Sequence, residues 1–254
     1  MNTENTEPST SLADNPIDFV RWLRDVAPYV HTFRDKTFVI AFDGELVEQG
    51  HLEDLAYDVS LLRAMGMRIV LVHGARPQIE RQLALRDKSS EFINGVRITS
   101  SAALNSVKEA SGALRLSIEA AFSQGLPNTP MAGSDINVVS GNFVTAKPIG
   151  VLNGVDFQHT GEVRKVAHDD IIKQLAMGNV VLLSPLGFSP TGEAFNLTNT
   201  EVASSVAAAL KADKLIMLSD QDVLAEDGSW ISELDAAQGR QYAEALALDH
   251  PLRP

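Results

Sequence analysis

Apolar residues follow two different periods along this chain. Four short stretches are almost continuously apolar, as in strands buried on both faces of a sheet; they span residues 37–42, 68–73, 180–184 and 215–220. Between them, apolar residues recur every three or four positions, as on one face of a helix, over residues 51–65, 102–124 and 201–210. A helix between two such strands implies a parallel pair with a right-handed crossover. The pattern therefore predicts an α/β fold around a mostly parallel sheet.

A separate amphipathic helix is predicted over residues 15–34. Asn15 is a suitable N-cap, Pro16 suits the first helical position, and Pro28 is expected to loosen the end of the helix. The apolar residues of this helix share one face and are Phe19, Val20, Leu23, Val26, Ala27 and Val30. This face either packs on the rest of the chain or is an exposed stripe that marks a subunit contact. Residues 1–14 are polar and lack periodicity, so a disordered lead-in is expected.

The remainder, residues 35–254, is interpreted as one domain, because no linker and no internal repeat divides it. Within it, residues 136–146 carry the turn-like sequence Ser140-Gly141-Asn142 between two apolar runs. That arrangement predicts a β-hairpin.

Composition narrows the function classes. The chain has 33 acidic and 21 basic residues, a net charge of −12, which argues against nucleic acid or an anionic membrane as the main partner. It has no continuous apolar stretch of membrane-spanning length, and its first residues lack the features of a secretory signal, so a cytoplasmic location is expected. There are no cysteines, and the six histidines are not spaced as metal ligands. We therefore expect no disulfide and no metal site.

The stretch RIVLVHGARPQIERQL, residues 68–83, holds candidate chemistry. It is a strand, a turn containing Gly74, Ala75 and Arg76, and a helix, which is the order in which helix N-terminal amides bind anions. Arg76 is suited to pair with a carboxylate. A strand-to-helix turn also needs a glycine simply to change direction, so a purely structural role stays open.

Six blocks in order carry a resemblance to a known family: DKTFVIAFDGE (35–45), VHGARPQI (72–79), NGVRIT (94–99), INVVSGNF (136–143), TGEAFNLT (191–198) and ADKLIMLSD (212–220). Together they resemble the amino-acid-kinase family and, within it, the kinase-like domain of bacterial N-acetylglutamate synthases. The resemblance implies a three-layer fold, with helices on both faces of the central sheet and an N-terminal helix in front.

The departures from the related acetylglutamate kinases concern phosphoryl transfer. The resemblance places Ala41 where those kinases have a lysine, Asp43 near the expected phosphate, and Thr200 where they have an aspartate. Ala75 and Arg76 replace two glycines of the second turn. These replacements predict that the chain has no catalytic residues for phosphoryl transfer.

In synthases of this type, a further domain of the GNAT acetyltransferase type catalyses acetyl transfer. No loop typical of acetyl-CoA binding is found here, so we expect no cofactor in this chain, acetyl-CoA being a substrate of the complete enzyme. The chain also ends before the last elements of the kinase-like fold, which predicts a domain incomplete at its C-terminus, as in a fragment of a two-domain enzyme.

The resemblance also implies ligand residues. Arg97 matches an arginine that binds the substrate carboxylate in the kinase relatives, and Asn196 matches an asparagine that binds the ligand nearby. With Gly74, Ala75 and Arg76 they would form a vestigial acetylglutamate-like pocket. Taken singly, Arg97 and Asn196 are better explained as surface or capping residues.

Arginine-regulated relatives use their N-terminal helix to form rings and to bind L-arginine. Tyr29 matches the helix residue at that site, and Glu233 is a candidate carboxylate partner by position only. Both have ordinary alternatives, a packing tyrosine and a solvated glutamate. L-arginine is the expected effector, and a homo-oligomer through the N-terminal helix is the expected assembly.

The sequence thus favours a regulatory, kinase-like domain of an N-acetylglutamate synthase, the enzyme that makes N-acetylglutamate from acetyl-CoA and L-glutamate at the start of arginine biosynthesis. A divergent ATP-dependent acetylglutamate kinase is one alternative. A free-standing arginine or acetylglutamate sensor is another.

Overall fold

The computed structural model describes residues 16–124, 136–219, 223–225 and 229–245. The predicted lead-in, residues 1–14, and the predicted cap Asn15 lie outside these residues. The four apolar runs form strands and the three periodic stretches form helices, as predicted.

The central sheet has five strands, all parallel, in the order β13-β1-β2-β10-β5. These strands are β1 (Thr37–Phe42), β2 (Arg68–His73), β5 (Val138–Ser140), β10 (Val180–Leu183) and β13 (Lys214–Leu218). The first crossover holds α2 (Gly44–Glu48) and α3 (Leu52–Ala64) and ends at Gly66, whose φ of +92° only glycine adopts readily. The predicted βαβ unit is confirmed.

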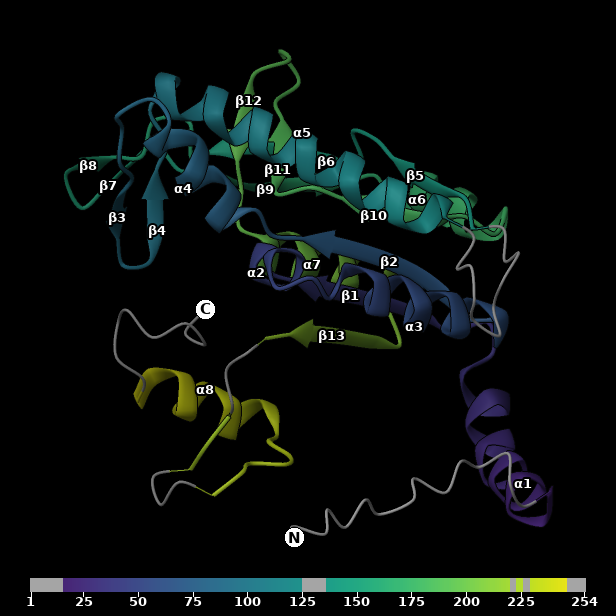
Figure 1. The fold of residues 1–254 in the computed structure, drawn as a ribbon. Helices are drawn as coiled ribbons and strands as arrows, with labels where there is room; N and C mark the ends of the chain where they lie inside the picture. The colour runs from purple at the N-terminus through teal and green to yellow at the C-terminus, as the bar shows by residue number, and fades with distance from the viewer. Residues whose placement is uncertain (1–15, 125–135, 220–222, 226–228, 246–254) are drawn as a thin grey trace, which may run out of the picture.

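Helices cover both faces of this sheet (Figure 1). Successive residues of a strand point to opposite faces, so Ile40 and Val39 belong to different apolar cores. The Ile40 core includes residues of α3, of α4 (Arg76–Ala84) and of α5 (Ser101–Ser123). The Val39 core includes residues of α6 (His168–Ala176) and α7 (Asn199–Leu210). The expected three-layer α/β architecture is therefore confirmed.

A second sheet of four strands packs into the Val39 core, in the order β12-β11-β6-β9. Its strands are β6 (Val144–Pro148), β9 (Gly161–Val166), β11 (Leu186–Phe188) and β12 (Ala194–Asn196). The hairpin predicted over residues 136–146 is wrong, because β5 pairs with β10 in the first sheet whereas β6 pairs with β9 in the second. Gly141 therefore connects two sheets instead of closing a hairpin.

Two small hairpins lie beside the sheets. One pairs β3 (Glu91–Ile93) with β4 (Val96–Ile98), and the other pairs β7 (Val151–Leu152) with β8 (Val155–Asp156). Each turns at an Asn-Gly pair with positive φ at both residues, the geometry of a type I′ turn. The first hairpin matters for the candidate site, because it sets Phe92 opposite Arg97.

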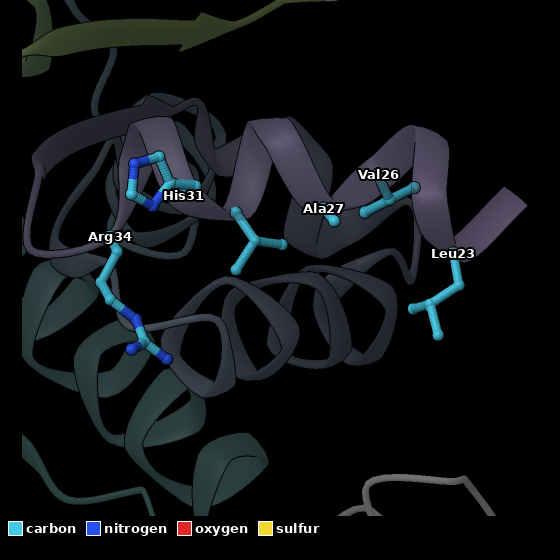
Figure 2. Close-up of a pocket in the computed structure, with 6 residues that line it drawn as sticks. Leu23, Val26, Ala27, His31 and Arg34 are labelled. Atoms are coloured by element: carbon cyan, nitrogen blue, oxygen red, sulfur yellow. The ribbon is translucent and has the colours of Figure 1, made fainter.

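The predicted N-terminal helix is present as α1 (Pro16–Phe33), and it continues through Pro28 to Phe33. In Figure 1 it projects from the sheet as the purple helix. Its apolar stripe is exposed along much of the helix: Val20 is 43% exposed and Leu23 is 52% exposed. Figure 2 shows Leu23 and Arg34 projecting from the same side, along a groove that α1 residues line. Of the two alternatives drawn from the sequence, the exposed stripe is the one observed.

A three-residue turn, residues 34–36, joins α1 to β1. Asp35 has a φ of +62°, in the left-handed region, and its backbone N–H donates to the Gly66 carbonyl at 2.9 Å. Phe33 packs edge-on against Phe38 of β1, with ring centroids 5.5 Å apart. These contacts set the direction in which α1 leaves the sheet.

The described part of the chain ends with α8 (Ala236–Ala245), which follows β13. None of the described helices combines the length and the apolarity needed to cross a membrane.

Candidate functional site

The carboxyl ends of the parallel strands meet the starts of α4 and α7 at one edge of the central sheet. In open α/β sheets, ligands bind at this edge. β1 ends at Phe42, β2 at His73 and β10 at Leu183, while α4 begins at Arg76 and α7 at Asn199.

Gly74 lies at the centre of this edge. It is buried, and its N–H donates to the Phe42 carbonyl at 2.7 Å. A Cβ at this position would lie only 3.2 Å from Asp43 Cα and from Asn199 Nδ2. Glycine is therefore needed here for the close approach of three chain segments.

Asp43 and Asn199 pair directly above this glycine. The Asn199 amide donates to the Asp43 carboxylate at 2.8 Å. Ala41, two residues earlier, is fully buried in the Val39 core. This part of the edge holds a carboxylate and has no lysine at residue 41, so its charge does not favour phosphate.

Beneath Gly74, His73 is fully buried. Its Nδ1 lies 3.0 Å from the Gly74 carbonyl and its Nε2 lies 2.9 Å from the Ser184 hydroxyl. Because a carbonyl only accepts, Nδ1 carries the proton and Ser184 donates to Nε2. The pKa of His73 is lowered to about 4, chiefly by burial; the hydrogen bond to Gly74 opposes this shift and the Arg115 charge contributes to it. The imidazole is therefore neutral, and its two hydrogen bonds stabilise the turn.

A second part of this edge carries two positively charged side chains, those of Arg76 and Arg97. The guanidinium carbons of Arg76 and Arg97 lie 4.7 Å and 4.8 Å from the centroid of the Phe92 ring, within the range of cation–π contacts. Phe92 and Arg97 reach this position through the β3–β4 hairpin, and Arg76 through the start of α4. Both guanidinium groups thus contact the same aromatic ring.

Arg97 is only 6% exposed and pairs with Glu80 Oε1 at 2.7 Å. Burial lowers its pKa, and the Arg76 charge adds to this lowering, whereas Glu80 raises it. Arginine remains protonated in proteins. Two guanidiniums facing one carboxylate leave an excess of about one positive charge, which favours an anionic ligand.

Asn196 is linked to this group through two buried threonines. Its amide donates to Thr99 Oγ1 at 3.0 Å, and the Thr160 hydroxyl lies 2.9 Å from Thr99 Oγ1 and 2.5 Å from the Arg97 carbonyl. Asn196 is 7% exposed. The asparagine and Arg97 are therefore held in one hydrogen-bonded unit.

The structure thus brings Arg76 and Arg97 together, links Asn196 to the Arg97 main chain, and sets Gly74 and the buried Ala75 at the start of α4. Phe92 and Glu80 were not identified from the sequence. The Asn94-Gly95 dipeptide was the available signal, because a hairpin centred on it places Phe92 opposite Arg97.

The residues predicted to bind L-arginine lie elsewhere. Tyr29 is on α1 and is 67% exposed. Glu233 is exposed in the segment that leads into α8. Figure 1 shows α1 and α8 well separated, so one chain does not bring their elements together. Their role as arginine ligands stays a prediction.

Among the residues that the structure describes, no three His, Asp or Glu side chains are grouped closely enough to hold a metal ion.

Comparison with known proteins agrees with this architecture. Residues 36–248 match the model of the amino acid kinase family. An amino-acid acetyltransferase from Ralstonia nicotianae is 65% identical over 202 residues, which are 80% of this chain and 45% of that protein.

Two solved structures are similar over a comparable length. N-acetylglutamate synthase from Neisseria gonorrhoeae, complexed with coenzyme A and N-acetyl-glutamate, matches with a TM-score of 0.82 and 37% identity over 91% of this chain and 53% of that one. The same enzyme complexed with coenzyme A and L-arginine matches with a TM-score of 0.81 and 37% identity over 90% and 54%. The chain spans about half the length of the relatives that it matches.

Proposed function

Because the chain belongs to the amino acid kinase family, we propose that it uses this fold to bind an amino-acid ligand and to assemble, without transferring phosphate. In this proposal it is the regulatory, kinase-like part of an amino-acid acetyltransferase that makes N-acetyl-L-glutamate from acetyl-CoA and L-glutamate. Acetyl transfer belongs to the remainder of such an enzyme, since this chain spans about half of its relatives.

One observation carries the proposal: the sheet edge has two cations, Arg76 and Arg97, where we propose that a carboxylate binds, and it has the Asp43 carboxylate where a kinase would hold phosphate. Phosphoryl transfer depends on positive charge around the transferring group. Asp43, held by Asn199 over Gly74, supplies the opposite charge, and the buried methyl group of Ala41 cannot replace a lysine.

The ligand class follows from the retained charges. Arg76 and Arg97 favour a carboxylate, and the first amides of α4, after Ala75, favour a second anionic group. Asn196 offers an amide for a neutral acyl or amide group. A small N-acylated dicarboxylate such as N-acetyl-L-glutamate meets these requirements, and one similar structure is named for its complex with that molecule.

Assembly and arginine response rest on α1. An exposed apolar stripe on a helix that projects from its own sheet favours contact with another subunit. Such a contact would give Tyr29 a second protein surface, as a guanidinium site requires, and Glu233 is the candidate carboxylate. L-arginine is the proposed effector, in line with the related synthase complexed with it.

The test is binding of N-acetyl-L-glutamate to the full chain by isothermal titration calorimetry. We expect Arg97→Gln to weaken binding by about 10- to 100-fold, the range for losing a charge-assisted hydrogen bond. Because Arg97 is buried, circular dichroism must first show a folded variant, and the exposed Arg76→Gln provides an independent measurement. Arg86→Gln, which removes an arginine paired with Glu109 instead, is the matched control.

Unchanged affinity in both Arg76→Gln and Arg97→Gln would contradict the pocket. Phosphorylation of N-acetyl-L-glutamate by the chain with ATP would contradict the loss of phosphoryl transfer.

A further inference from the structure

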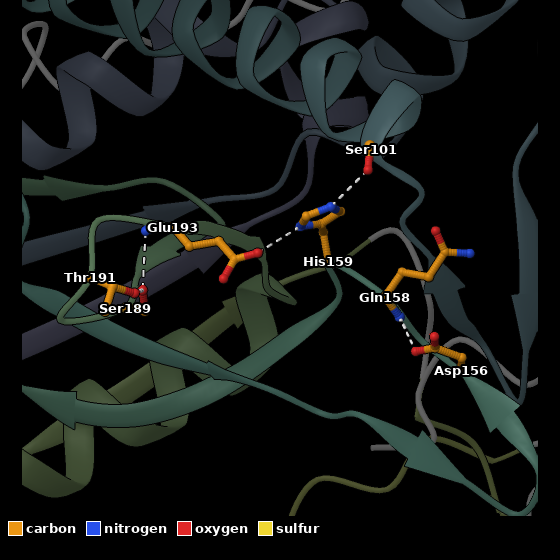
Figure 3. A network of polar contacts seen from close by, with 7 residues as sticks. All are labelled: Ser101, Asp156, Gln158, His159, Ser189, Thr191 and Glu193. Atoms are coloured by element: carbon orange, nitrogen blue, oxygen red, sulfur yellow. Dashed lines mark hydrogen bonds and ion pairs between the residues drawn. The ribbon is translucent and has the colours of Figure 1, made fainter.

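Three polar side chains outside the proposed pocket form a row that the proposed function does not use. Ser101 Oγ lies 3.0 Å from His159 Nε2, and His159 Nδ1 lies 3.4 Å from Glu193 Oε1 (Figure 3). Each imidazole nitrogen thus faces a different partner. The 3.4 Å contact is an ion-pair distance and not a hydrogen bond; the nearby carboxylate favours the tautomer that carries its proton on Nδ1, which leaves Nε2 to accept from the serine hydroxyl.

Each member of the row is held by a separate element. Ser101 is the first residue of α5, and the preceding Ser100 caps the helix by accepting from Ala103 N–H at 3.2 Å. A capped first turn fixes the Cα–Cβ direction of the serine.

His159 is held through its main chain on both sides. Its N–H donates to the Thr99 carbonyl, and its own carbonyl accepts from Asn196 N–H, both at 2.9 Å. The preceding Gln158 has a φ of +53°, and its N–H donates to Asp156 Oδ1 at 2.9 Å. The imidazole is therefore anchored between α5 and β12.

Glu193 is held in the turn between β11 and β12. Its N–H donates to Ser189 Oγ at 3.0 Å, and its carbonyl accepts from Ser189 N–H at 2.8 Å. The three side chains therefore stand in the order serine, histidine and carboxylate, which is the order found in activated serines of many unrelated folds.

We propose that Ser101 is a nucleophile activated by His159 and oriented by Glu193, and that it reacts with small activated carboxylic esters. Ser101 is exposed, and the side chains of His159 and Glu193 are 23% and 52% exposed, so a small ester reaches the hydroxyl from solvent. Ser101 and Glu193 are distinct from the residues of the proposed pocket.

The start of α5 supplies the electrostatic part of the reaction. The first amides of a helix have no intrahelical acceptor, and the helix dipole is positive at this end. α5 is 23 residues long. An oxyanion that forms beside Ser101 Oγ would meet the N–H groups at this end that Ser100 does not already accept from, as in sites that stabilise tetrahedral intermediates.

The proposed reaction has two steps. Ser101 Oγ attacks the ester carbonyl carbon while His159 Nε2 takes the hydroxyl proton; the bond to the leaving oxygen breaks, and that oxygen receives the proton. Water then attacks the acyl-serine, His159 takes a proton from the water, and the bond between the acyl carbon and Oγ breaks as Oγ regains a proton. The products are an alcohol or phenol and a carboxylic acid.

The first test is labelling of the full chain with a fluorophosphonate, followed by peptide mass spectrometry. We expect the label on Ser101, and we expect its rate of formation to fall by about 10²-fold in His159→Gln, the lower end of a general base's contribution. Ser117→Ala is the matched control, because Ser117 is an exposed serine of the same helix whose hydroxyl donates to the Ala113 carbonyl instead. No label on Ser101, or an equal rate in His159→Gln, overturns the proposal.

The second test exploits the absence of cysteine from the sequence. Ser101→Cys and Ser117→Cys each create a single thiol, whose alkylation by iodoacetamide is followed at pH 7. A neighbouring histidine and a helix N-terminus favour the thiolate, so we expect alkylation at position 101 to be at least about tenfold faster. Equal rates in the two folded variants overturn the proposal without any assumption about the substrate.

The third test concerns Glu193 as a positioning residue. Hydrolysis of p-nitrophenyl acetate should fall in Glu193→Gln through kcat with KM little changed, and should recover in part in Glu193→Asp, which keeps the carboxylate. Equal kcat values in all three proteins overturn the orienting role.

Discussion

The helices α1 and α5 each carry an apolar face, and of these two only α5 buries it. In α5, Val107 and Ile118 are completely buried against the central sheet and its neighbouring helices. In α1, Val20 and Leu23 of the apolar face are 43% and 52% exposed. Helical periodicity therefore identifies an apolar face without identifying what covers it. For α5 the partner lies within the domain, and for α1 we propose that it is another subunit.

The largest expected effect is on the α5 side of this comparison. Ile118→Asp would bury an unpaired charge in the Ile40 core, which we expect to cost about 4 kcal/mol or more of the free energy of unfolding. Leu116→Asp is the matched control, because Leu116 lies on the same helix and is 58% exposed, and its change should stay within about 0.5 kcal/mol. Urea denaturation followed by circular dichroism measures both, and similar losses would contradict the burial difference.

An intermediate effect is expected from pH, because the chain also has a buried and an exposed histidine, His73 in β2 and His31 in α1. The pKa of His73 is lowered from 6.5 to about 4, so between these values only the unfolded chain binds a proton there. Stability therefore falls as pH falls through this window, by about 1.4 kcal/mol per unit and about 3 kcal/mol in all.

The measurement is the free energy of unfolding at pH 7 and pH 5 in the original chain and two variants. His73→Asn should be less stable at pH 7 but should lose less stability toward pH 5, whereas His31→Gln should keep the original pH dependence. The same slope in His73→Asn would show that this imidazole does not contribute to the acid sensitivity.

The smallest effect on monomer stability is expected in α1. Leu23→Asp should change the free energy of unfolding by no more than about 0.5 kcal/mol, because the side chain is already half exposed. The same substitution should abolish self-association, measured by analytical ultracentrifugation at several concentrations. Asp25→Lys, on the opposite side of the helix, is the control. A variant that associates as the original chain does would show that this stripe is not the subunit contact.

The sequence predicts four of the five central strands, because these four read as continuous apolar runs. Three of them, β1, β2 and β10, are buried on both faces, whereas β13 exposes Leu215 and Met217. Prediction from the sequence fails where neighbouring strands separate into different sheets. The Ser140-Gly141-Asn142 turn signal is local, whereas the pairing of β5 with β10 and of β6 with β9 depends on residues far along the chain. The strands of the second sheet were not predicted for a further reason: each has only three to six residues, which is too few to show a clear periodicity.

The candidate site shows a similar division. Resemblance to a family selected Arg97 and Asn196, and the structure connects them through Thr99 and Thr160. The ion pair with Glu80 joins α4 to the β3–β4 hairpin, a contact that no local pattern reveals. The family-like sequence segments thus identified single residues, whereas the pairing of their charges with Glu80 became visible only in the three-dimensional structure.

A small rotation in the turn at Asp35 would displace the far end of α1 by a much larger distance than its near end. At 1.5 Å per residue, its 18 residues span about 27 Å, so a rotation of about 10° in this turn moves the far end of the helix by about 5 Å. The same rotation hardly moves β1, which is hydrogen-bonded on both sides to β2 and β13. A rearrangement too small to disturb the sheet is thereby magnified at the far end of α1, where displacements of several ångströms decide which surfaces of two molecules meet.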